Sequence, residues 1–264
     1  MPSVEFSTRD FLDCLGSDYS VAELEGAIPM IGVGLDFIDG ERIVLEVFPN
    51  RPDMLCVEGF ARAFRGFMGV DRGLRAYGVG DSGITFFVEH SVEKVRPFVS
   101  CGVVLGVSMD DATVKSIMDI QEKLHLTHGR NRRKVAIGVH DLDKVKPPFT
   151  YKAVSPESVS FVPLDSSERM NLREILERHP KGMAFAHVLD GLLLYPVIVD
   201  RDSAVLSFPP IINGELSRLT GGTRNLFVEV TGWSQLAVDQ AVNIITSSMA
   251  DRGGRVMSVE LKKK

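Results

Sequence analysis

The stretch from Tyr195 to Gly232 constrains the fold of this chain most strongly. Two apolar runs, Val197–Val199 and Ala204–Phe208, flank the turn-forming segment Asp200-Arg201-Asp202, and this arrangement predicts a β-hairpin. Strand pairing has to stop at Pro209-Pro210, because neither proline has a backbone N–H to donate. The stretch therefore predicts rigid β-structure bounded by turns.

Polar side chains interrupt this β-structure at the strand ends and at the glycine turns. Glu229 stands inside the apolar run Leu226–Val230, where a carboxylate is costly to bury without a partner. Polar groups at strand ends beside glycine turns are typical of a rigid binding pocket, but they are equally typical of ordinary residues that cap β-structure. Both interpretations apply to Ser207, Asn213, Glu215, Thr223, Asn225, Glu229 and Thr231.

The remaining chain mixes helical and extended patterns without strict alternation, which favours an α+β fold with mixed sheets over a doubly wound sheet. A small N-terminal α/β unit is predicted over 1–75, a linker over 76–83 and a larger mixed-sheet domain over 84–264. Within the larger domain, Met183–Leu189 and Leu192–Val199 are predicted to be paired strands.

Local signals predict the ends of several elements. Ser7 is the predicted N-cap of a short helix. The alternating runs Gly32–Ile38 and Ile43–Val47 flank Asp39-Gly40, which is a strong hairpin turn. Asp110–Leu126 has the apolar spacing of an amphipathic helix. Together these signals place helices and strands in both predicted units.

The composition is that of a globular protein: of 264 residues, 44% are hydrophobic and 25% charged, and the net charge is −5. An acidic surface does not attract nucleic acid as a whole, so any such contact has to be local. Cys14, Cys56 and Cys101 lack metal-ligand spacing, which favours reduced thiols and a cytoplasmic location. With neither a secretory signal pattern nor a membrane-length apolar run, no membrane contact is expected.

Three groups of residues point to chemistry. The basic run Arg130-Asn131-Arg132-Arg133-Lys134 is either a phosphate clamp or a solvated loop. His140 ends a predicted strand and either orients a water or ribose hydroxyl or is structural. Glu215 and Glu229 are acceptors for a hydrogen bond from a phenol or an amine. Because no Walker loop, dinucleotide fingerprint, zinc-protease motif or EF-hand pattern occurs, we expect neither a metal nor a cofactor in this chain.

Four segments resemble the beta subunit of phenylalanyl-tRNA synthetase of the archaeal and eukaryotic type. They read PNRPDMLCVEGFARAFRGFMG from Pro49, QEKLHLTHGRNRRKVAIGVHDLDKVKPPFTY from Gln121, LSFPPIINGELSRLTGGTRNLFVEVTG from Leu206 and SVE from Ser258. The likeness covers essentially the whole chain. Because family members continue past the position of Lys264, the resemblance implies an N-terminal fragment. The alternative is a free-standing relative of the family's editing module.

The resemblance implies a function and partners. The family's synthetase is a heterotetramer of two alpha and two beta subunits. Its alpha subunit binds ATP and Mg²⁺ and attaches phenylalanine to tRNA(Phe). Its beta subunit carries an editing domain that hydrolyses mischarged Tyr-tRNA(Phe), expected here over 84–264 and without a cofactor of its own. A second possible role, without turnover, is to position the tRNA end and assemble with the alpha subunit.

Family position also implies roles for single residues. The implied catalytic residues are His140, Glu229 and Thr231. The implied substrate-binding residues are Ser207, Asn213, Gly214 and Glu215. The basic run supplies the expected tRNA-binding residues, which are Arg130, Arg132, Arg133 and Lys134. Glu229 is the first choice as acceptor for the phenol of tyrosine, and Glu215 is the second.

Overall fold

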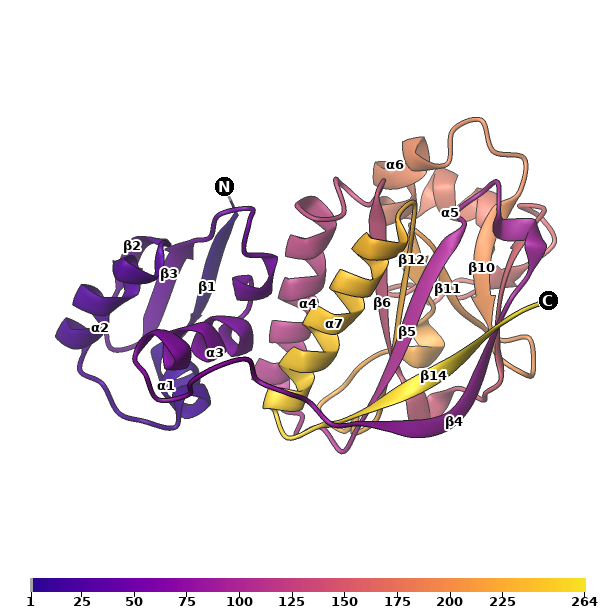
Figure 1. Cartoon of the computed structure of the whole chain (residues 1–264). Coiled ribbons are helices and arrows are strands. Elements are labelled where there is room, and N and C mark those ends of the chain that lie inside the picture. Colours follow the sequence, from indigo (N-terminus) through magenta and orange to yellow (C-terminus); the bar gives the residue numbers. More distant parts are fainter. Residues whose placement is uncertain (1) are drawn as a thin grey trace.

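The computed structural model describes residues 2–264, which form a small N-terminal unit beside a larger one (Figure 1). The small unit contains an antiparallel sheet in the order β1-β3-β2. Its strands are β1 (Ser3–Ser7), β2 (Gly34–Ile38) and β3 (Arg42–Glu46). Its helical segments are α1 (Thr8–Leu15), α2 (Val21–Ala27) and α3 (Val57–Phe67), with 3-10 turns η1 (Ile28–Ile31) and η2 (Pro52–Met54). Packed phenylalanine rings join the helices to the sheet: Phe6, Phe11, Phe60 and Phe64.

Side-chain caps fix the ends of these elements. Ser7 caps α1 through its hydroxyl oxygen, as the sequence predicts. Ser20 and Glu23 form a reciprocal capping box at the start of α2. Asp39 accepts two backbone hydrogen bonds of 2.8 Å at the turn between β2 and β3. The predicted hairpin is therefore confirmed, and it is closed by its own aspartate.

The larger unit is built on a nine-stranded mixed sheet in the order β12-β11-β10-β7-β4-β14-β5-β13-β6. Its strands are β4 (Val79–Val88), β5 (Phe98–Leu105), β6 (Val135–Asp141), β7 (Phe149–Val154), β10 (Tyr195–Val199), β11 (Val205–Phe208), β12 (Ile212–Asn213), β13 (Leu226–Gly232) and β14 (Arg255–Lys263). A separate ladder joins β8 (Ser160–Phe161) and β9 (Met170–Asn171). Strand β4 pairs in parallel with β14 and β7, whereas the other pairs are antiparallel. The predicted α+β fold with a mixed sheet is confirmed.

Two long helices, α4 (Asp111–Leu126) and α7 (Gln235–Asp251), lie between this sheet and the small unit (Figure 1). One continuous apolar core joins both helices, the adjoining face of β13 and the small unit. The shorter segments are α5 (Leu172–Arg178), α6 (Pro180–Phe185), η3 (His90–Val92), η4 (Leu142–Lys144), η5 (Ala186–Val188) and η6 (Glu215–Ser217). Within residues 2–264, none of the helices has both the length and the apolar character needed to cross a bilayer.

Two predicted segments differ from the structure. Residues 79–83, expected in a linker, begin β4 and pair with β14. Met183–Leu189, expected to be a strand paired with Leu192–Val199, instead ends α6 and forms η5. Pro180 explains the second difference, because a proline at the first helical position needs no N–H partner and its φ suits a helix. His179 caps this helix through its side chain.

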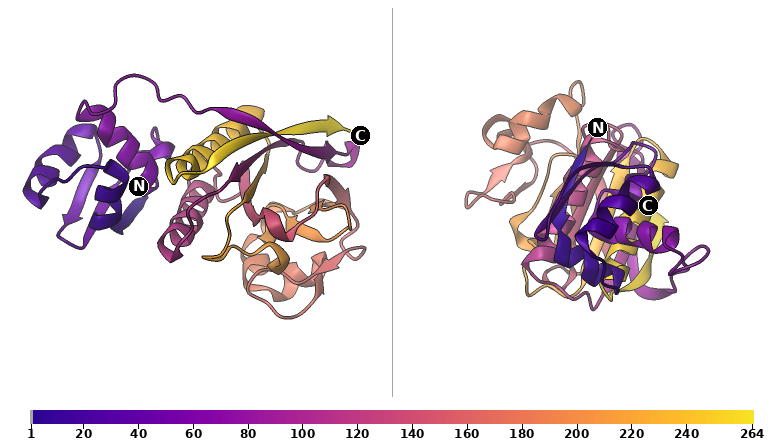
Figure 2. Two further views of the ribbon diagram at one scale, coloured as in Figure 1. Left: turned by 90° about the horizontal axis from the view of Figure 1, so that it is seen from below. Right: turned by 90° about the vertical axis from the view of Figure 1, so that its left-hand side faces the viewer.

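The nine-stranded sheet curls until its two ends meet. In the left view of Figure 2, the orange strands of one end fold back beneath the yellow and purple strands. Ser207 of β11 donates a hydrogen bond of 2.9 Å to Glu229 of β13. Asn213 of β12 donates one of 3.5 Å to the carbonyl of Val139 in β6. The curl therefore creates a seam between two sheet ends that are far apart in strand order.

Side chains of α4 satisfy the outer backbone groups of the edge strand β6. The N–H of Ile137 donates to His125 Nε2 at 2.8 Å, and Gln121 Nε2 donates to the carbonyl of Ile137 at 3.2 Å. Because His125 Nε2 accepts, the proton of the neutral imidazole lies on Nδ1. Burial lowers the pKa of His125 to about 4. The neutral form of this histidine is thus built into the contact between α4 and the sheet.

Arg252, which follows α7, joins the small unit to the large one. Its guanidinium donates to both carboxylate oxygens of Asp10, at 2.7 and 2.8 Å, and to Glu58 Oε1 at 2.7 Å. Glu58 is only 1% exposed and also accepts from the hydroxyl of Ser116 at 3.1 Å. A carboxylate buried this deeply depends on its cation, since removal of the partner leaves an uncompensated charge.

We expect Arg252→Met to lower the free energy of unfolding by about 3 kcal/mol, because Glu58 stays buried without its cation. Urea unfolding followed by circular dichroism measures the change. The matched control is Arg42→Met, whose pair with Glu5 is 3.8 Å long and has both side chains more than half exposed. The Arg42→Met substitution should lower the free energy of unfolding by at most about 0.5 kcal/mol. Equal losses in the two variants would contradict the role of Arg252.

His125 makes stability depend on pH. Its pKa of about 4 in the folded state is below the ordinary value of 6.5, so the unfolded chain binds more protons between these values. Stability is therefore lost as the pH falls from 6.5 towards 4. We expect the contribution of His125 to the free energy of unfolding to be about 2 kcal/mol lower at pH 5 than at pH 7. Urea unfolding should show a smaller drop for His125→Gln and an unchanged drop for His90→Gln, since the His90 side chain is 74% exposed. The same drop in all three proteins would refute the assignment.

Candidate functional site

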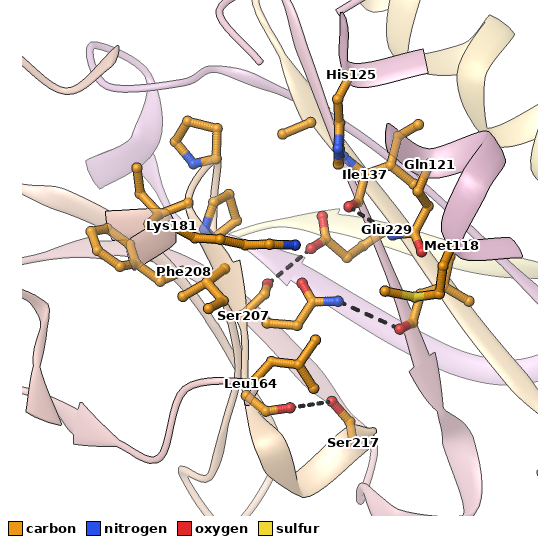
Figure 3. A pocket seen from close by; sticks show the side chains of 18 of the residues that line it. Met118, Gln121, His125, Ile137, Leu164, Lys181, Ser207, Phe208, Ser217 and Glu229 are labelled. Carbon is orange, nitrogen blue, oxygen red and sulfur yellow. Dashed lines mark hydrogen bonds between the residues drawn. The ribbon is translucent and has the colours of Figure 1, made fainter. Parts of the chain in front are cut away.

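A pocket opens at the seam between the two ends of the curled sheet (Figure 3). Its cavity volume is about 130 Å³, roughly ten times what one buried water needs. The apolar part of its wall includes Val114, Met118, Ile137, Val139, Phe208, Ile211 and Ile212. The polar part includes Gln121, Glu122, His125, Arg132, Lys181, Ser207, Asn213, Ser217, Arg218 and Glu229. The pocket therefore combines an apolar wall with a polar one that carries several charged groups.

Glu229 is the deepest charged group of this pocket and is 2% exposed. Its Oε1 accepts the hydrogen bond from Ser207 at 2.9 Å, whereas its Oε2 has no hydrogen-bond partner among residues 2–264. Gly138 lies opposite Glu229 on β6, and a Cβ there would come within 2.3 Å of Oε1. The carboxylate thus occupies space that a side chain at position 138 would otherwise fill. The pocket holds one acceptor oxygen that the protein itself leaves unpaired.

His140 lies behind Glu229 rather than in the wall of the pocket. It is fully buried, and its Nε2 is 3.8 Å from Glu229 Oε1, which is too far for a hydrogen bond. Its Nδ1 is 2.7 Å from the hydroxyl of Ser217, and its ring stacks on Phe227. The structure brings this predicted catalytic residue beside Glu229, where it can support the carboxylate but does not face the cavity.

Thr231 points to a different partner. It is fully buried, and its hydroxyl accepts a hydrogen bond of 2.9 Å from Arg96 Nε. Arg96 Nη2 also donates to the carbonyl of Thr231 at 2.9 Å. Thr231 shares a strand face with Glu229, two residues away on β13, but it does not line the pocket. The structure therefore separates this predicted catalytic residue from the cavity.

The predicted substrate-binding residues are divided by the turn that follows β12. Asn213 and Gly214 line the pocket, and Gly214 N–H donates to the carbonyl of Leu206 at 2.7 Å. Glu215 instead turns outward and accepts from Arg218 Nε at 2.6 Å. This contact with Arg218 lowers the pKa of Glu215. Glu215 is thus an ion-paired residue of the surface turn and does not line the pocket.

The basic run is split in two, which corrects one prediction. Arg132, expected on the tRNA-facing surface, is 5% exposed and points into the pocket. Its guanidinium donates to the carbonyl of Ile211 at 2.8 Å and to Glu122 at 2.8 Å. Arg130 and Arg133 are exposed and line a separate hollow together with Lys134. Of the four cations of the basic run, Arg130, Arg133 and Lys134 therefore remain available at the surface.

Six polar pocket residues escaped the prediction: Gln121, Glu122, His125, Lys181, Ser217 and Arg218. Glu122 Oε1 lies 2.8 Å from Arg132 and 3.2 Å from Lys181. Burial would raise the pKa of Glu122, but its contacts with His125, Arg132 and Lys181 outweigh burial and hold the pKa well below its usual range. Figure 3 shows the Lys181 side chain reaching across the pocket towards Glu229. The sequence held one usable signal, which is the spacing of Gln121 and His125 on the buried side of the predicted helix.

Metal-binding chemistry has no obvious place here. Across the described part of the chain, residues 2–264, no three His, Cys, Asp or Glu side chains are grouped closely enough to hold an ion. The acidic group nearest to the pocket's centre, Glu229, has a serine as its polar partner. What the pocket offers is a buried carboxylate, a second carboxylate between two cations, and apolar walls.

Comparison with known proteins gives consistent results. The family model described as "B3/4 domain" matches residues 108–261. The phenylalanine–tRNA ligase beta subunit of Archaeoglobus fulgidus is 50% identical over 261 residues, which are 99% of this chain and 47% of that protein. The beta subunit of Methanocaldococcus jannaschii is 44% identical over 268 residues, or 100% of this chain and 48% of that protein. The chain thus spans about half the length of the curated relatives it matches.

A solved structure agrees with the sequence comparisons. The N-terminal fragment of the phenylalanyl-tRNA synthetase beta subunit from Pyrococcus horikoshii superposes with a TM-score of 0.95 at 37% identity. The superposition covers 100% of this chain and 77% of the Pyrococcus fragment. The likeness therefore includes both the small unit and the curled sheet. By sequence and by fold, the chain belongs to the family of phenylalanine–tRNA ligase beta subunits.

Proposed function

We propose that the pocket at the seam hydrolyses the ester of mischarged Tyr-tRNA(Phe). The observation that carries this proposal is the unpaired Oε2 of Glu229 in a cavity with apolar walls. A buried carboxylate oxygen without a donor is costly, and the hydroxyl of a phenol is a donor that would satisfy it. Tyrosine would thus bind with its ring against the apolar wall and its hydroxyl on Glu229.

The same geometry would reject phenylalanine. A bare ring in this pocket would offer Glu229 no hydrogen bond, so the buried carboxylate oxygen would stay unpaired. A site built to hydrogen-bond a hydroxyl can reject the analogue that lacks it by about 10⁴-fold. The opposite selection, exclusion of tyrosine from an apolar pocket, achieves only about 10²-fold. A second pocket of this kind would supply the discrimination that a pocket for phenylalanine lacks.

The residues around Glu122 are placed to serve the hydrolytic step. Water adds to the ester carbonyl carbon, the bond to the ribose oxygen breaks, and the ribose hydroxyl leaves with a proton. Glu122 stays ionised because its pKa is held low, and a carboxylate of low pKa is a weak base. We therefore assign it to orientation of the water, with Lys181 and Arg132 available for the negative charge that develops on the ester oxygen.

The curated relatives that match this chain are about twice its length and are beta subunits of a phenylalanine–tRNA ligase. We propose that the chain acts within a cytoplasmic synthetase that attaches phenylalanine to tRNA(Phe). An alpha subunit would be the partner and would bind ATP and Mg²⁺. In this arrangement the pocket corrects the product of another site. The same pocket in a free-standing protein would edit in trans.

Deacylation of tRNA tests the proposal. The chain is incubated with labelled Tyr-tRNA(Phe) and, separately, with Phe-tRNA(Phe), and release of the amino acid is followed over time. We expect release of tyrosine at least about tenfold faster than that of phenylalanine. Binding of both tRNAs without release of either amino acid would instead favour the module that positions the tRNA end and assembles with the alpha subunit.

Glu229 variants test the proposed acceptor. Glu229→Ala should lower the rate of Tyr-tRNA(Phe) hydrolysis by about 100-fold, because a hydrogen bond to a charged group is worth about 1.5–3 kcal/mol. Glu229→Gln should lose less, since its amide oxygen still accepts from the phenol. The matched control is Glu215→Gln on the adjoining surface turn, which should keep the wild-type rate. Full activity in Glu229→Ala would move recognition of the phenol to another group.

A further inference from the structure

A second hollow lies next to the pocket and is not explained by ester hydrolysis. It has a volume of about 610 Å³. It is lined by Arg130, Asn131, Arg133, Lys134, His187 and Trp233, so that cations and aromatic rings meet without any acidic residue. Trp233 is 51% exposed, although it is a large aromatic side chain in an acidic protein. An exposed indole beside cations presents a flat face for stacking together with positive charge.

The cations of this hollow are free to meet an anion. Within residues 2–264, the side chains of Arg130, Arg133 and Lys134 form no ion pair with any carboxylate. Other surface arginines of the chain do have such partners, for example Arg173 with Glu157 at 2.5 Å. Three unpaired cations in a protein of net charge −5 concentrate positive potential at one place.

The loop that carries these cations is held in a strained conformation. Arg130, Asn131 and Arg132 have φ values of 49°, 53° and 67°, which are left-handed conformations that non-glycine residues rarely adopt. Gly129 opens the turn, and a Cβ there would lie 2.6 Å from the carbonyl of Val135. Such strain persists only where the surrounding structure fixes the backbone, and it is common at binding sites.

A buried arginine fixes that backbone. Arg96 is 2% exposed and donates to the carbonyls of Arg132 and Arg133, both at 3.2 Å. The same guanidinium holds the hydroxyl and carbonyl of Thr231 on β13. The backbone N–H of Trp233, two residues further on, donates to the carbonyl of Lys134 at 3.0 Å. The cations and the tryptophan are therefore held on one rigid frame before any ligand binds.

The hollow and the pocket are lined by different residues, but the same turn contributes to both. Arg132 belongs to the strained turn, yet its guanidinium enters the pocket. It also lies 4.4 Å from the centre of the Phe185 ring, two residues before His187 of the hollow. One turn therefore supplies Arg132 to the pocket and Arg130, Arg133 and Lys134 to the hollow.

We propose that the hollow binds a short single-stranded RNA end, with one base stacked on Trp233 and the phosphates of successive nucleotides on Arg130, Arg133 and Lys134. Bases of a duplex are already stacked on each other and present no free face. An unpaired base of a single strand has a free face that can stack on an aromatic ring. Aromatic stacking together with backbone cations is how proteins bind single strands of any sequence. This inference rests on the proposed function, because the hollow would bind the RNA whose aminoacylated end enters the pocket.

Trp233 is itself the reporter, because it is the chain's single tryptophan. Titration of the chain with the unacylated oligoribonucleotide ACCA should quench its fluorescence to saturation. A blunt RNA duplex and a poly-glutamate peptide should quench at least about tenfold more weakly at equal concentration. Raising the salt concentration should weaken binding of ACCA, with a log–log slope near about −2 for three phosphate contacts.

Variants separate stacking from charge, with labelled ACCA followed by fluorescence anisotropy. Trp233→Leu should weaken binding about tenfold or more, and Trp233→Phe should restore part of the loss. Arg133→Gln should reduce the salt slope by about 0.7. The matched control Arg201→Gln, whose side chain is 61% exposed on the β10–β11 turn, should change neither quantity.

Two results would overturn the inference: equal binding of ACCA by Trp233→Leu and the wild type, or equal quenching by duplex, peptide and ACCA. Both can occur while Tyr-tRNA(Phe) is still hydrolysed. In that case the proposed RNA binding by the hollow is wrong, and the proposed editing by the pocket is not affected. Conversely, ACCA can bind in a way that depends on Trp233 while Tyr-tRNA(Phe) is not hydrolysed. This result would support RNA binding by the hollow and contradict the proposed hydrolysis. The binding assay uses no ester, so the two outcomes are distinguishable.

Discussion

The buried carboxylate of Glu229 is the group on which the site depends. A charge inside an apolar strand has to be satisfied, and its two sheet neighbours do not do so: Gly138 has no side chain, and Cys101 on the other side forms no hydrogen bond with it. Ser207 supplies one hydrogen bond, but it lies at the opposite end of the nine-stranded sheet. The sheet has to curl for the two to meet, and the pocket is the space left at that seam.

Much of the fold follows from local sequence signals. Ser7, the Asp39 turn and the hairpin before Pro209 have short-range causes, so the structure agrees with the sequence there. Met183–Leu189 shows the limit, because its apolar residues suit either a strand or a helix. The segment is helical because Pro180 occupies the first position of a helix. In a sequence, proline is more often taken to mark the end of a helix.

The site was predictable only in part, for a physical reason. Glu229 was visible because a carboxylate within an apolar strand is anomalous at the level of sequence. The direction of a side chain in a loop is not visible in this way. Arg132 points inward and Arg133 outward because three consecutive residues adopt positive φ, and Arg96, from a distant loop, holds that turn. No spacing rule connects Arg96 with the basic run.

Under the two proposals, the seam pocket would select the amino-acid side chain and the basic hollow would bind the end of the RNA chain. The central claim is that Glu229 reads the hydroxyl of tyrosine. A crystal structure of this chain with a non-hydrolysable tyrosyl-adenosine tests it most directly. The account predicts the phenol oxygen within about 3 Å of Glu229 Oε2, with the ring against the apolar wall. A phenol that points away from Glu229, towards the solvent or a backbone amide, would contradict it.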